Sequence, residues 1–245
     1  MASNPPSTCC TKVTLHTGNP TGSITKFAGL QSYITSNYSS SSTRFLIIFT
    51  DIYGIKLPNT QLVADTFASL LGYPVIVPDI LQDDIYINGT DFNDWFSRHP
   101  PQLTIDILKT FFLEFQNKHP KIDFIAGIGY CFGAKYLSHY LTNDSFLKFD
   151  VGAFAHPSFV SEDELNAITK PLIISAAETD TIFPRDLRYK SEEILQKNGI
   201  HYQIDLFQGV EHGFTVRGDL NNKFVKYAAE KALTDQVAFF KFHEN

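Results

Sequence analysis

From residue 44 onward, short apolar runs alternate with longer stretches of helical periodicity. The run FLIIFT at 45–50 predicts a strand buried on both faces, and the stripe of Val63, Phe67 and Leu70 predicts a helix at 58–71. Parallel strands need a crossover connection, usually a helix, so this alternation constrains the chain to an α/β fold with a mostly parallel central sheet and helices on both faces. Further strands are predicted at 75–77, 123–128, 151–155, 172–176 and 202–207, and further helices at 101–118, 132–141, 185–197 and 220–240.

Two segments lack this alternation. Residues 1–43 form a polar N-terminal segment, and its serine run at 39–42 predicts a loop or mobile turn. Residues 79–100 show few periodic signals, and we predict a long loop with short helical pieces. Because 245 residues suit one shared core, we expect a single domain over 1–245 without a separate cap domain.

Charge and cysteine content limit the possible binding partners and the cellular compartment. The net charge of −6, without a long basic run, argues against nucleic acid or an anionic membrane as the main partner. No apolar run approaches the roughly 20 residues that a membrane-spanning helix needs. The start MASNPPSTCC does not resemble a signal peptide, and Cys9, Cys10 and Cys131 are too few for a disulfide framework. We expect a cytoplasmic protein, and the pattern predicts no particular oligomeric state.

The segment GYCFG at 129–133 lies where a predicted buried strand passes into a predicted helix. This is the G-x-S-x-G nucleophile elbow with cysteine in the serine position. The turn is tight enough to require glycine on both sides, and it predicts an exposed Cys131 sulfur above a helix N-terminus, which favours the thiolate. The alternatives are a buried structural cysteine and a dinucleotide-binding turn, although the spacing of Gly127, Gly129 and Gly133 departs from G-x-G-x-x-G.

An acid and a base follow the elbow in the order that such hydrolases require, nucleophile then acid then histidine. Asp180 follows the strand at 172–176, with Glu178 as its competitor, and His212 follows the strand at 202–207 on a loop containing glycine. His156 also follows a strand and could line the pocket, but it precedes the acid. We therefore expect Cys131, His212 and Asp180 to meet at one edge of the sheet.

Four segments carry a resemblance to a known family: DIYG at 51–54, GYCFG at 129–133, AETD at 177–180 and EHGFTVRG at 211–218. On these motifs the chain resembles the dienelactone hydrolase family of α/β-hydrolases from about Thr11 onward. The pair Cys9–Cys10 is similar to the fungal branch. The resemblance implies hydrolysis of cyclic enol-lactones or related small esters by a cysteine–histidine–aspartate triad, without a metal or other cofactor.

By this resemblance, Cys131 would attack the ester carbonyl to form a thioester, His212 would exchange protons and Asp180 would hold the imidazole. The oxyanion hole would use the backbone N–H groups of Phe132, just after the nucleophile, and of Ile52, just after FLIIFT. Preorganised donors of this kind lower a barrier by about 3–4 kcal/mol.

Other residues are candidates for substrate binding or for tuning the nucleophile. Bacterial members of the family have a glutamate where this chain has Asp51. The shorter aspartate either tunes the protonation of the nucleophile or caps its own loop. Bacterial members also bind the substrate carboxylate with arginines, and Arg217, whose fork suits a carboxylate, lies in the corresponding segment. Substrate choice would be set by the loop 79–100. The further candidates are Tyr53, Trp95, Arg98 and His156.

Two other functions stay open at this point. The protein could keep the pocket and bind or sense a small ligand without turnover, since one fold hosts many functions. Alternatively, an alcohol or thiol could replace water as the acceptor, which would make the protein an acyltransferase. A thiolate attacks readily and is itself easily expelled, so activated esters are expected as substrates rather than amides.

Overall fold

A central sheet organises the computed structural model, which describes residues 1–244 apart from the side chains of Thr8 and Cys9. The eight strands lie in the order β1-β2-β4-β3-β5-β6-β7-β8. They are β1 (Ser23–Phe27), β2 (Leu30–Ile34), β3 (Arg44–Phe49), β4 (Val75–Pro78), β5 (Phe124–Tyr130), β6 (Val151–Ala155), β7 (Leu172–Thr179) and β8 (Tyr202–Glu211). Strands β3 to β8 are parallel, whereas β2 pairs antiparallel with both β1 and β4. The predicted mostly parallel sheet is confirmed.

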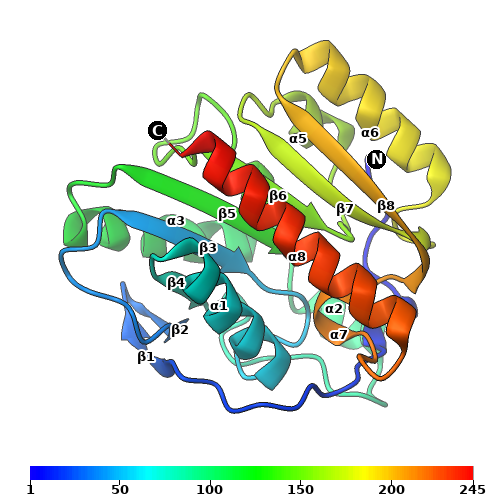
Figure 1. Ribbon diagram of the computed structural model, residues 1–245, viewed down its shortest axis with the longest axis horizontal. Helices are drawn as coiled ribbons and strands as arrows, with labels where there is room; N and C mark the ends of the chain where they lie inside the picture. Colours follow the sequence, from blue (N-terminus) through cyan, green and yellow to red (C-terminus); the bar gives the residue numbers. More distant parts are fainter. Residues whose placement is uncertain (245) are drawn as a thin grey trace.

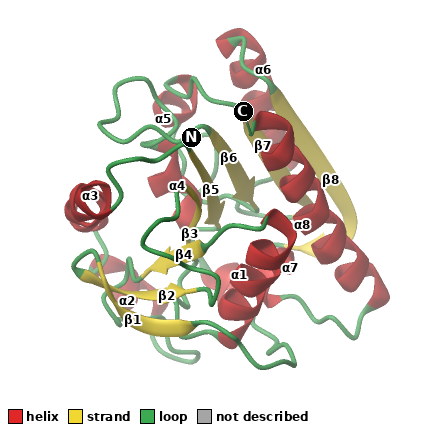
Figure 2. Ribbon diagram, turned by 60° about the vertical axis from the view of Figure 1, so that its left-hand side comes forward, coloured by secondary structure: helices red, strands yellow, loops and turns green. Residues whose placement is uncertain are grey.

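Helices cover both faces of the sheet. They are α1 (Pro58–Leu71), α2 (Phe92–Ser97), α3 (Pro101–Lys118), α4 (Gly133–Ser138), α5 (Glu162–Asn166), α6 (Arg185–Asn198), α7 (Phe214–Arg217) and α8 (Lys223–His243), with a short 3-10 helix at Thr8–Thr11. Helices α1 and α8 lie side by side over one face, and α3 and α4 lie over the other (Figures 1 and 2). The predicted α/β-hydrolase architecture is therefore present.

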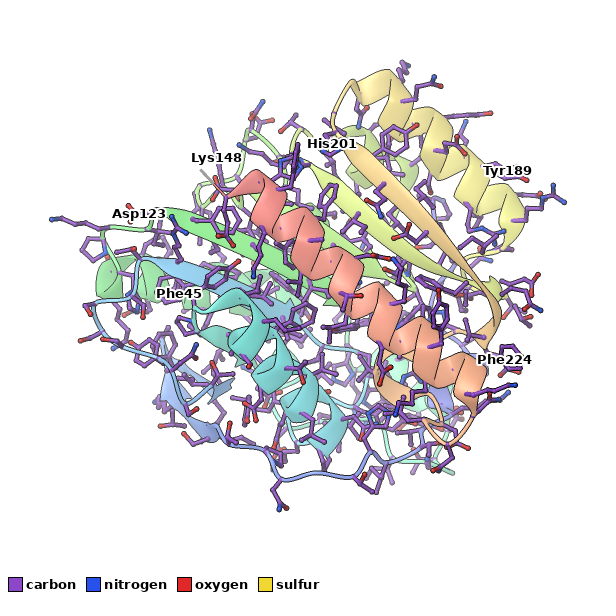
Figure 3. All side chains as sticks on the ribbon, in the orientation of Figure 1. Phe45, Asp123, Lys148, Tyr189, His201 and Phe224 are labelled. Atoms are coloured by element: carbon purple, nitrogen blue, oxygen red, sulfur yellow. The ribbon has the colours of Figure 1, made fainter. Side chains whose placement is uncertain are left out.

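Apolar side chains fill the space between the sheet and these helices (Figure 3). Phe45 on β3 packs edge-on against Phe115 of α3, with ring centroids 5.0 Å apart. Figure 3 also shows His201, just before β8, beside the C-terminal end of α8, where its Nδ1 lies 2.8 Å from Nε2 of His243. This contact ties the C-terminal end of the long final helix to the start of β8.

The hairpin of β1 and β2 lies in the polar N-terminal segment, for which the sequence predicted no strand. Strand β1 (SITKF) exposes four of its five residues, so it lacks the alternating apolar pattern that identifies a strand in a sequence. Its turn uses Ala28 and Gly29, which both have positive φ, at 47° and 85°. The prediction for 79–100 is confirmed, since α2 is a short helical piece within an otherwise irregular segment.

A partly buried carboxylate joins α5 to α4, the helix that follows the elbow. Glu164 accepts hydrogen bonds from Lys135 Nζ at 2.6 Å and from the Ser161 N–H at 2.8 Å, and His139 Nε2 lies 3.2 Å away. Burial by itself would raise the pKa of Glu164. The hydrogen bonds of His139, Lys135 and Ser161 outweigh burial and lower that pKa to about 2. The charged carboxylate therefore stabilises this corner of the fold.

Glu164→Gln is expected to remove a pH-dependent part of the stability. The folded-state pKa lies below the ordinary value of 4.5, so the stabilisation is present above pH 4.5 and is lost as the pH falls toward 2. We expect the variant to lose about 2 kcal/mol of unfolding free energy at pH 7 and progressively less toward pH 3, measured by urea denaturation. An equal loss at both pH values would show that the carboxylate charge is not the source.

Candidate active site

The turn from β5 into α4 holds Cys131 in an unusual backbone conformation. Its φ of 49° lies in the left-handed region, which is unfavourable for a residue with a Cβ. The Cys131 N–H donates to the Ala155 carbonyl at 3.1 Å, and the Cys131 carbonyl accepts from the Ser158 N–H at 3.0 Å. These bonds to the end of β6 and the loop after it fix the turn. The sulfur consequently stands at the carboxyl edge of the sheet, as the elbow pattern predicts.

Gly133→Ala is expected to lower the free energy of unfolding by about 3 kcal/mol, measured by urea denaturation. A Cβ at Gly133 would overlap the carbonyl oxygen of Phe49, at the end of β3, and lie 2.5 Å from its carbonyl carbon. Gly133 is helical, so steric overlap alone opposes alanine there. The control is Gly29→Ala, with φ of 85° and no heavy atom within 4 Å, which should cost about 1 kcal/mol. Equal losses would rule out the overlap as the cause.

Cys131, His212 and Asp180 meet at this edge from three separate loops. His212 Nε2 lies 3.1 Å from Cys131 Sγ, and His212 Nδ1 lies 2.8 Å from Asp180 Oδ2. The other Asp180 oxygen accepts from the backbone N–H groups of Ile182 and Phe183, at 2.8 and 3.0 Å, which fixes the carboxylate. The geometry allows one proton to pass between sulfur and imidazole while the acid orients the ring.

Glu178, the competitor for the acid position, lies outside this cluster. Its side chain is exposed and accepts a hydrogen bond from the Gly209 N–H at 3.2 Å. It therefore supports the loop after β8, and of the two carboxylates Asp180 is the one that contacts His212.

The charges of the cysteine and histidine stabilise each other. Burial alone would raise the pKa of Cys131, but its hydrogen bond with Cys10 and the positive charge of His212 lower that pKa well below its ordinary value. Burial would likewise lower the pKa of His212, yet the Cys131 thiolate and the hydrogen bond to Asp180 raise it. A thiolate–imidazolium pair is the form that this environment stabilises, and the thiolate is the nucleophilic form of cysteine.

The prediction of an exposed sulfur is wrong, because Cys131 is 0% exposed. Residues 1–16, which we call the N-terminal strap, cross the carboxyl edge of the sheet and cover it. In Figure 1 the strap, in dark blue, passes the ends of β7 and β8. It is bonded to the loop after β6 through Ser3 and Val160, and to the loop after β7 through Asn4 and Ile182. Because the strap is far from Cys131 in sequence, the residues around the elbow gave no indication that the sulfur would be covered.

Cys10 of the strap lies directly on Cys131, with 3.6 Å between the two sulfurs, and it is also fully buried. Ser158 Oγ lies 3.4 Å from the same Cys131 sulfur. Neither residue was among the predicted site residues. The adjacent cysteines near the start of the chain were the only available signal for Cys10, while the sequence around Ser158 offers none.

His156 lies against the cluster, as its position after β6 suggested. Its ring centroid is 5.0 Å from that of His212, and its Nε2 is 2.8 Å from Thr215 Oγ1. Burial lowers the pKa of His156 to about 4, which keeps the imidazole neutral. It therefore contributes packing and hydrogen bonding beside the sulfur without adding a positive charge.

Asp51 and Arg217 form a buried ion pair beside the cluster, with 2.8 Å between Oδ2 and Nε and about 1% exposure of each side chain. Burial raises the pKa of Asp51 and the guanidinium opposes that rise. Arg217 Nη1 also donates to the carbonyl oxygens of Cys10 and Lys12 in the strap. In this conformation the charge of Arg217 is balanced by Asp51 and its Nη1 holds the strap, while its Nη2 is buried without a hydrogen-bond partner. Binding of a substrate carboxylate by Arg217 stays a prediction.

Tyr53 links the strap to the loop 79–100. Its hydroxyl lies 2.6 Å from the Thr11 carbonyl oxygen and 2.8 Å from Asn88 Oδ1. Asp51 Oδ1 also accepts from the Tyr53 N–H at 3.0 Å, which is the loop-capping role that the sequence left open. Asp51 thus caps its loop and pairs with Arg217 at the same time.

Trp95 and Arg98 serve the packing of α2. The Trp95 indole is 2% exposed, donates to the Asp84 carbonyl at 2.8 Å and stacks on His99. It reaches the site only indirectly, through an edge contact with Phe132 at 6.1 Å. Arg98 is half-exposed and paired with Asp84 and Asp94. Neither side chain contacts the Cys131 sulfur.

The two amides proposed for an oxyanion hole follow adjacent parallel strands. Phe49 of β3 pairs in register with Gly129 of β5, so the ends of these two strands lie together. Ile52 follows β3, and Phe132 is the N-cap residue of α4 directly after Cys131, so both residues lie at the carboxyl edge of the sheet.

The cavities agree with a covered site. A cavity of about 1000 Å³ lies between α1, α8 and the residues after the strap, with Leu62, Leu70 and Leu233 among its lining residues, and Cys131 does not line it. A smaller one, of about 270 Å³, reaches His212 and Arg217 and is walled on one side by strap residues 12–14. Opening the strap on this side would extend the smaller cavity to the sulfur.

A parallel sheet whose carboxyl edge carries a cysteine elbow, an acid and a histidine defines an α/β-hydrolase. The profile of the dienelactone hydrolase family matches residues 30–244. The chain is 38% identical to Hydrolase pyvD of Aspergillus violaceofuscus over 244 residues, 98% of each chain. It is 26% identical to Dienlactone hydrolase 1 of Gibberella moniliformis over 255 residues, 99% of this chain and 95% of that one. The chain belongs to the dienelactone hydrolase family and is a carboxylic ester hydrolase.

Solved structures share this fold. The dienelactone hydrolase-like promiscuous phosphotriesterase P91, from metagenomic libraries, superimposes with a TM-score of 0.67 and 12% identity, covering 88% of this chain and 93% of that one. Within residues 1–244, no helix combines the length and the apolar character that crossing a bilayer requires.

Proposed function

We propose that the protein hydrolyses small activated esters or lactones through a thioester on Cys131, with His212 as acid and base and Asp180 as the orienting group. The observation that carries this proposal is the continuous contact from Asp180 Oδ2 through His212 to the Cys131 sulfur, at 2.8 and 3.1 Å. The three groups come from different loops, and their environment stabilises the thiolate and the imidazolium. A cysteine with only a structural role would need neither the histidine nor the carboxylate beside it.

In the first half of the reaction, the Cys131 thiolate attacks the carbonyl carbon. Negative charge then develops on the carbonyl oxygen, where the N–H groups of Ile52 and Phe132 would stabilise it. His212 donates its proton to the leaving oxygen, and a thioester remains on Cys131. In the second half, neutral His212 takes a proton from water, hydroxide attacks the thioester, and the carboxylic acid leaves as the thiolate is restored.

The strap must move for this reaction, because the sulfur is fully covered. Its contacts with the sheet edge include hydrogen bonds of the backbone, such as that between Ser3 and Val160, which water can replace once the segment lifts. We therefore infer that substrate enters after the strap opens on the side of the smaller cavity.

The substrate preference follows from the ion pair beside the sulfur. Arg217 is neutralised by Asp51, so an extra carboxylate on the substrate gains little there. We propose uncharged activated esters and lactones as the preferred substrates over carboxylated dienelactones. Because the proposed nucleophile Cys131 is in no disulfide and must stay reduced to react, we also propose a reducing compartment, the cytoplasm, as the site of action.

Turnover of p-nitrophenyl acetate beside a carboxylated dienelactone tests the proposal, with Cys131→Ala as the matched inactive control. We expect hydrolysis by the wild type only and a higher kcat/KM for the uncharged ester. We also expect iodoacetamide to label Cys131 faster than Cys9 or Cys10. Absence of turnover combined with slow labelling of Cys131 would refute the catalytic assignment. A product that incorporates added alcohol in place of water would reassign the reaction to acyl transfer.

A further inference from the structure

Three metal-binding atoms converge beneath the N-terminal strap. Cys10 Sγ lies 3.6 Å from Cys131 Sγ, and Cys131 Sγ lies 3.1 Å from His212 Nε2. All three ligand atoms lie within 4.8 Å of one another, and all three residues are buried. Hydrolysis uses Cys131 and His212 but needs no second thiol, so Cys10 is unexplained by the proposed reaction.

The spacing of these atoms suits a tetrahedral thiophilic cation. With Zn–S bonds of about 2.3 Å and a Zn–N bond of about 2.05 Å, tetrahedral angles place two sulfurs about 3.8 Å apart and sulfur and nitrogen about 3.6 Å apart. Two of the observed separations, 3.6 and 3.1 Å, are within half an ångström of those values. The third, between Cys10 Sγ and His212 Nε2, is at most 4.8 Å and has to shorten for a metal to bind. Small movements of the strap and of the imidazole would therefore complete the three bonds.

The surroundings supply what such a site needs beyond its ligands. Asp180 Oδ2 lies 2.8 Å from His212 Nδ1 and so directs the opposite nitrogen, Nε2, toward the sulfurs. A carboxylate on the outer nitrogen of a metal-binding histidine orients the ring and raises its basicity. Two thiolates balance the charge of one divalent cation, which makes the buried assembly close to neutral.

We propose that Cys10, Cys131 and His212 form a binding site for a thiophilic divalent cation of the Zn²⁺ class, held in place by the N-terminal strap. Sulfur and imidazole donors select Zn²⁺ or Co²⁺ over the hard cations Mg²⁺ and Ca²⁺, which prefer oxygen. The bound ion occupies the nucleophile and the base together, so it inhibits hydrolysis and is not a cofactor. Metal binding stands independently of the proposed function, whereas the inhibition rests on it.

Titration of the reduced protein with Co²⁺ tests the site by absorption, without reference to activity. We expect one equivalent to produce thiolate-to-cobalt charge transfer and the d–d bands of tetrahedral Co²⁺, and Zn²⁺ to remove both by displacement. The Cys10→Ser variant should bind Zn²⁺ at least about 100-fold more weakly, and its charge transfer should fall by half. The matched control, Cys9→Ser, removes the neighbouring thiol in sequence and should keep the wild-type affinity.

Several outcomes would overturn the site. These are a wild-type protein without charge transfer, an octahedral cobalt spectrum, or a Cys10→Ser variant that binds Zn²⁺ as tightly as the wild type. The wild-type spectrum decides the matter even if Cys10→Ser is poorly folded, which circular dichroism would reveal. A tetrahedral cobalt spectrum in a protein that hydrolyses no ester would sustain the metal site and refute the proposed function. Ester hydrolysis that is insensitive to Zn²⁺, in a protein that gives no tetrahedral cobalt spectrum, would sustain the proposed function and refute the metal site.

Discussion

His212→Ala is expected to lower kcat/KM for p-nitrophenyl acetate by about 10⁴-fold. The imidazole lies 3.1 Å from the Cys131 sulfur and supplies the positive charge that keeps the buried thiolate stable. Without it, only the hydrogen bonds with Cys10 and His156 oppose the effect of burial on the pKa of Cys131, so the protonated form, which is a poor nucleophile, gains. The leaving oxygen also loses its proton donor, so both halves of the reaction slow down.

Two measurements separate this effect from general damage to the fold. Alkylation of Cys131 by iodoacetamide should slow together with hydrolysis, because both need the thiolate. The control is His201→Ala, which removes an exposed histidine paired with His243 near the end of α8 and should retain nearly full activity. A loss of less than tenfold in the His212 variant, with normal alkylation, would mean that another group activates the sulfur.

Arg217→Met is expected to lower the free energy of unfolding by about 3–5 kcal/mol. The substitution leaves the Asp51 carboxylate without its counter-ion at a position that is about 1% exposed. It also removes the bonds from Nη1 to the carbonyl oxygens of Cys10 and Lys12, so the strap should loosen. We therefore expect lower stability in urea denaturation together with faster alkylation of Cys131.

The double variant Asp51→Asn/Arg217→Met should recover part of this loss, about 2 kcal/mol, because no unpaired charge remains buried. For comparison, Lys231→Met breaks an exposed pair with Asp235 on α8 and should cost less than about 1 kcal/mol. If Arg217→Met cost no more than Lys231→Met, or if the double variant were less stable than Arg217→Met alone, the pair would not be the source of the stability.

Local physics explains why much of the fold could be predicted. A strand such as β5, buried along its whole length, must be apolar throughout, and the helix after it must begin where the elbow glycines permit close approach to β3. The same reasoning placed Asp180 and His212 at strand ends, and parallel strands bring those ends to one edge. The hairpin of β1 and β2 escaped prediction because an edge strand that exposes most of its residues has the composition of a loop.

The contacts between distant residues that control access to the site could not be predicted from any local sequence pattern. Asp51 and Arg217 each looked suited to a substrate or to the nucleophile, and only folding showed that they neutralise each other. Cys10 lies in a polar segment without periodicity, yet its sulfur rests on the nucleophile. Contacts of this kind depend on the path of the chain across the sheet edge, which has no sequence period.

The sequence by itself determined the parallel sheet, the elbow and the positions of Cys131, Asp180 and His212 at strand ends, because each follows from burial, turn geometry or strand direction within a few residues. Only the tertiary structure decided that a strap of residues 1–16 covers the sulfur, that a second thiol touches it and that the arginine beside it is already paired. These features arise where segments distant in sequence share one edge, so their energies depend on packing and charge between partners that no local pattern links.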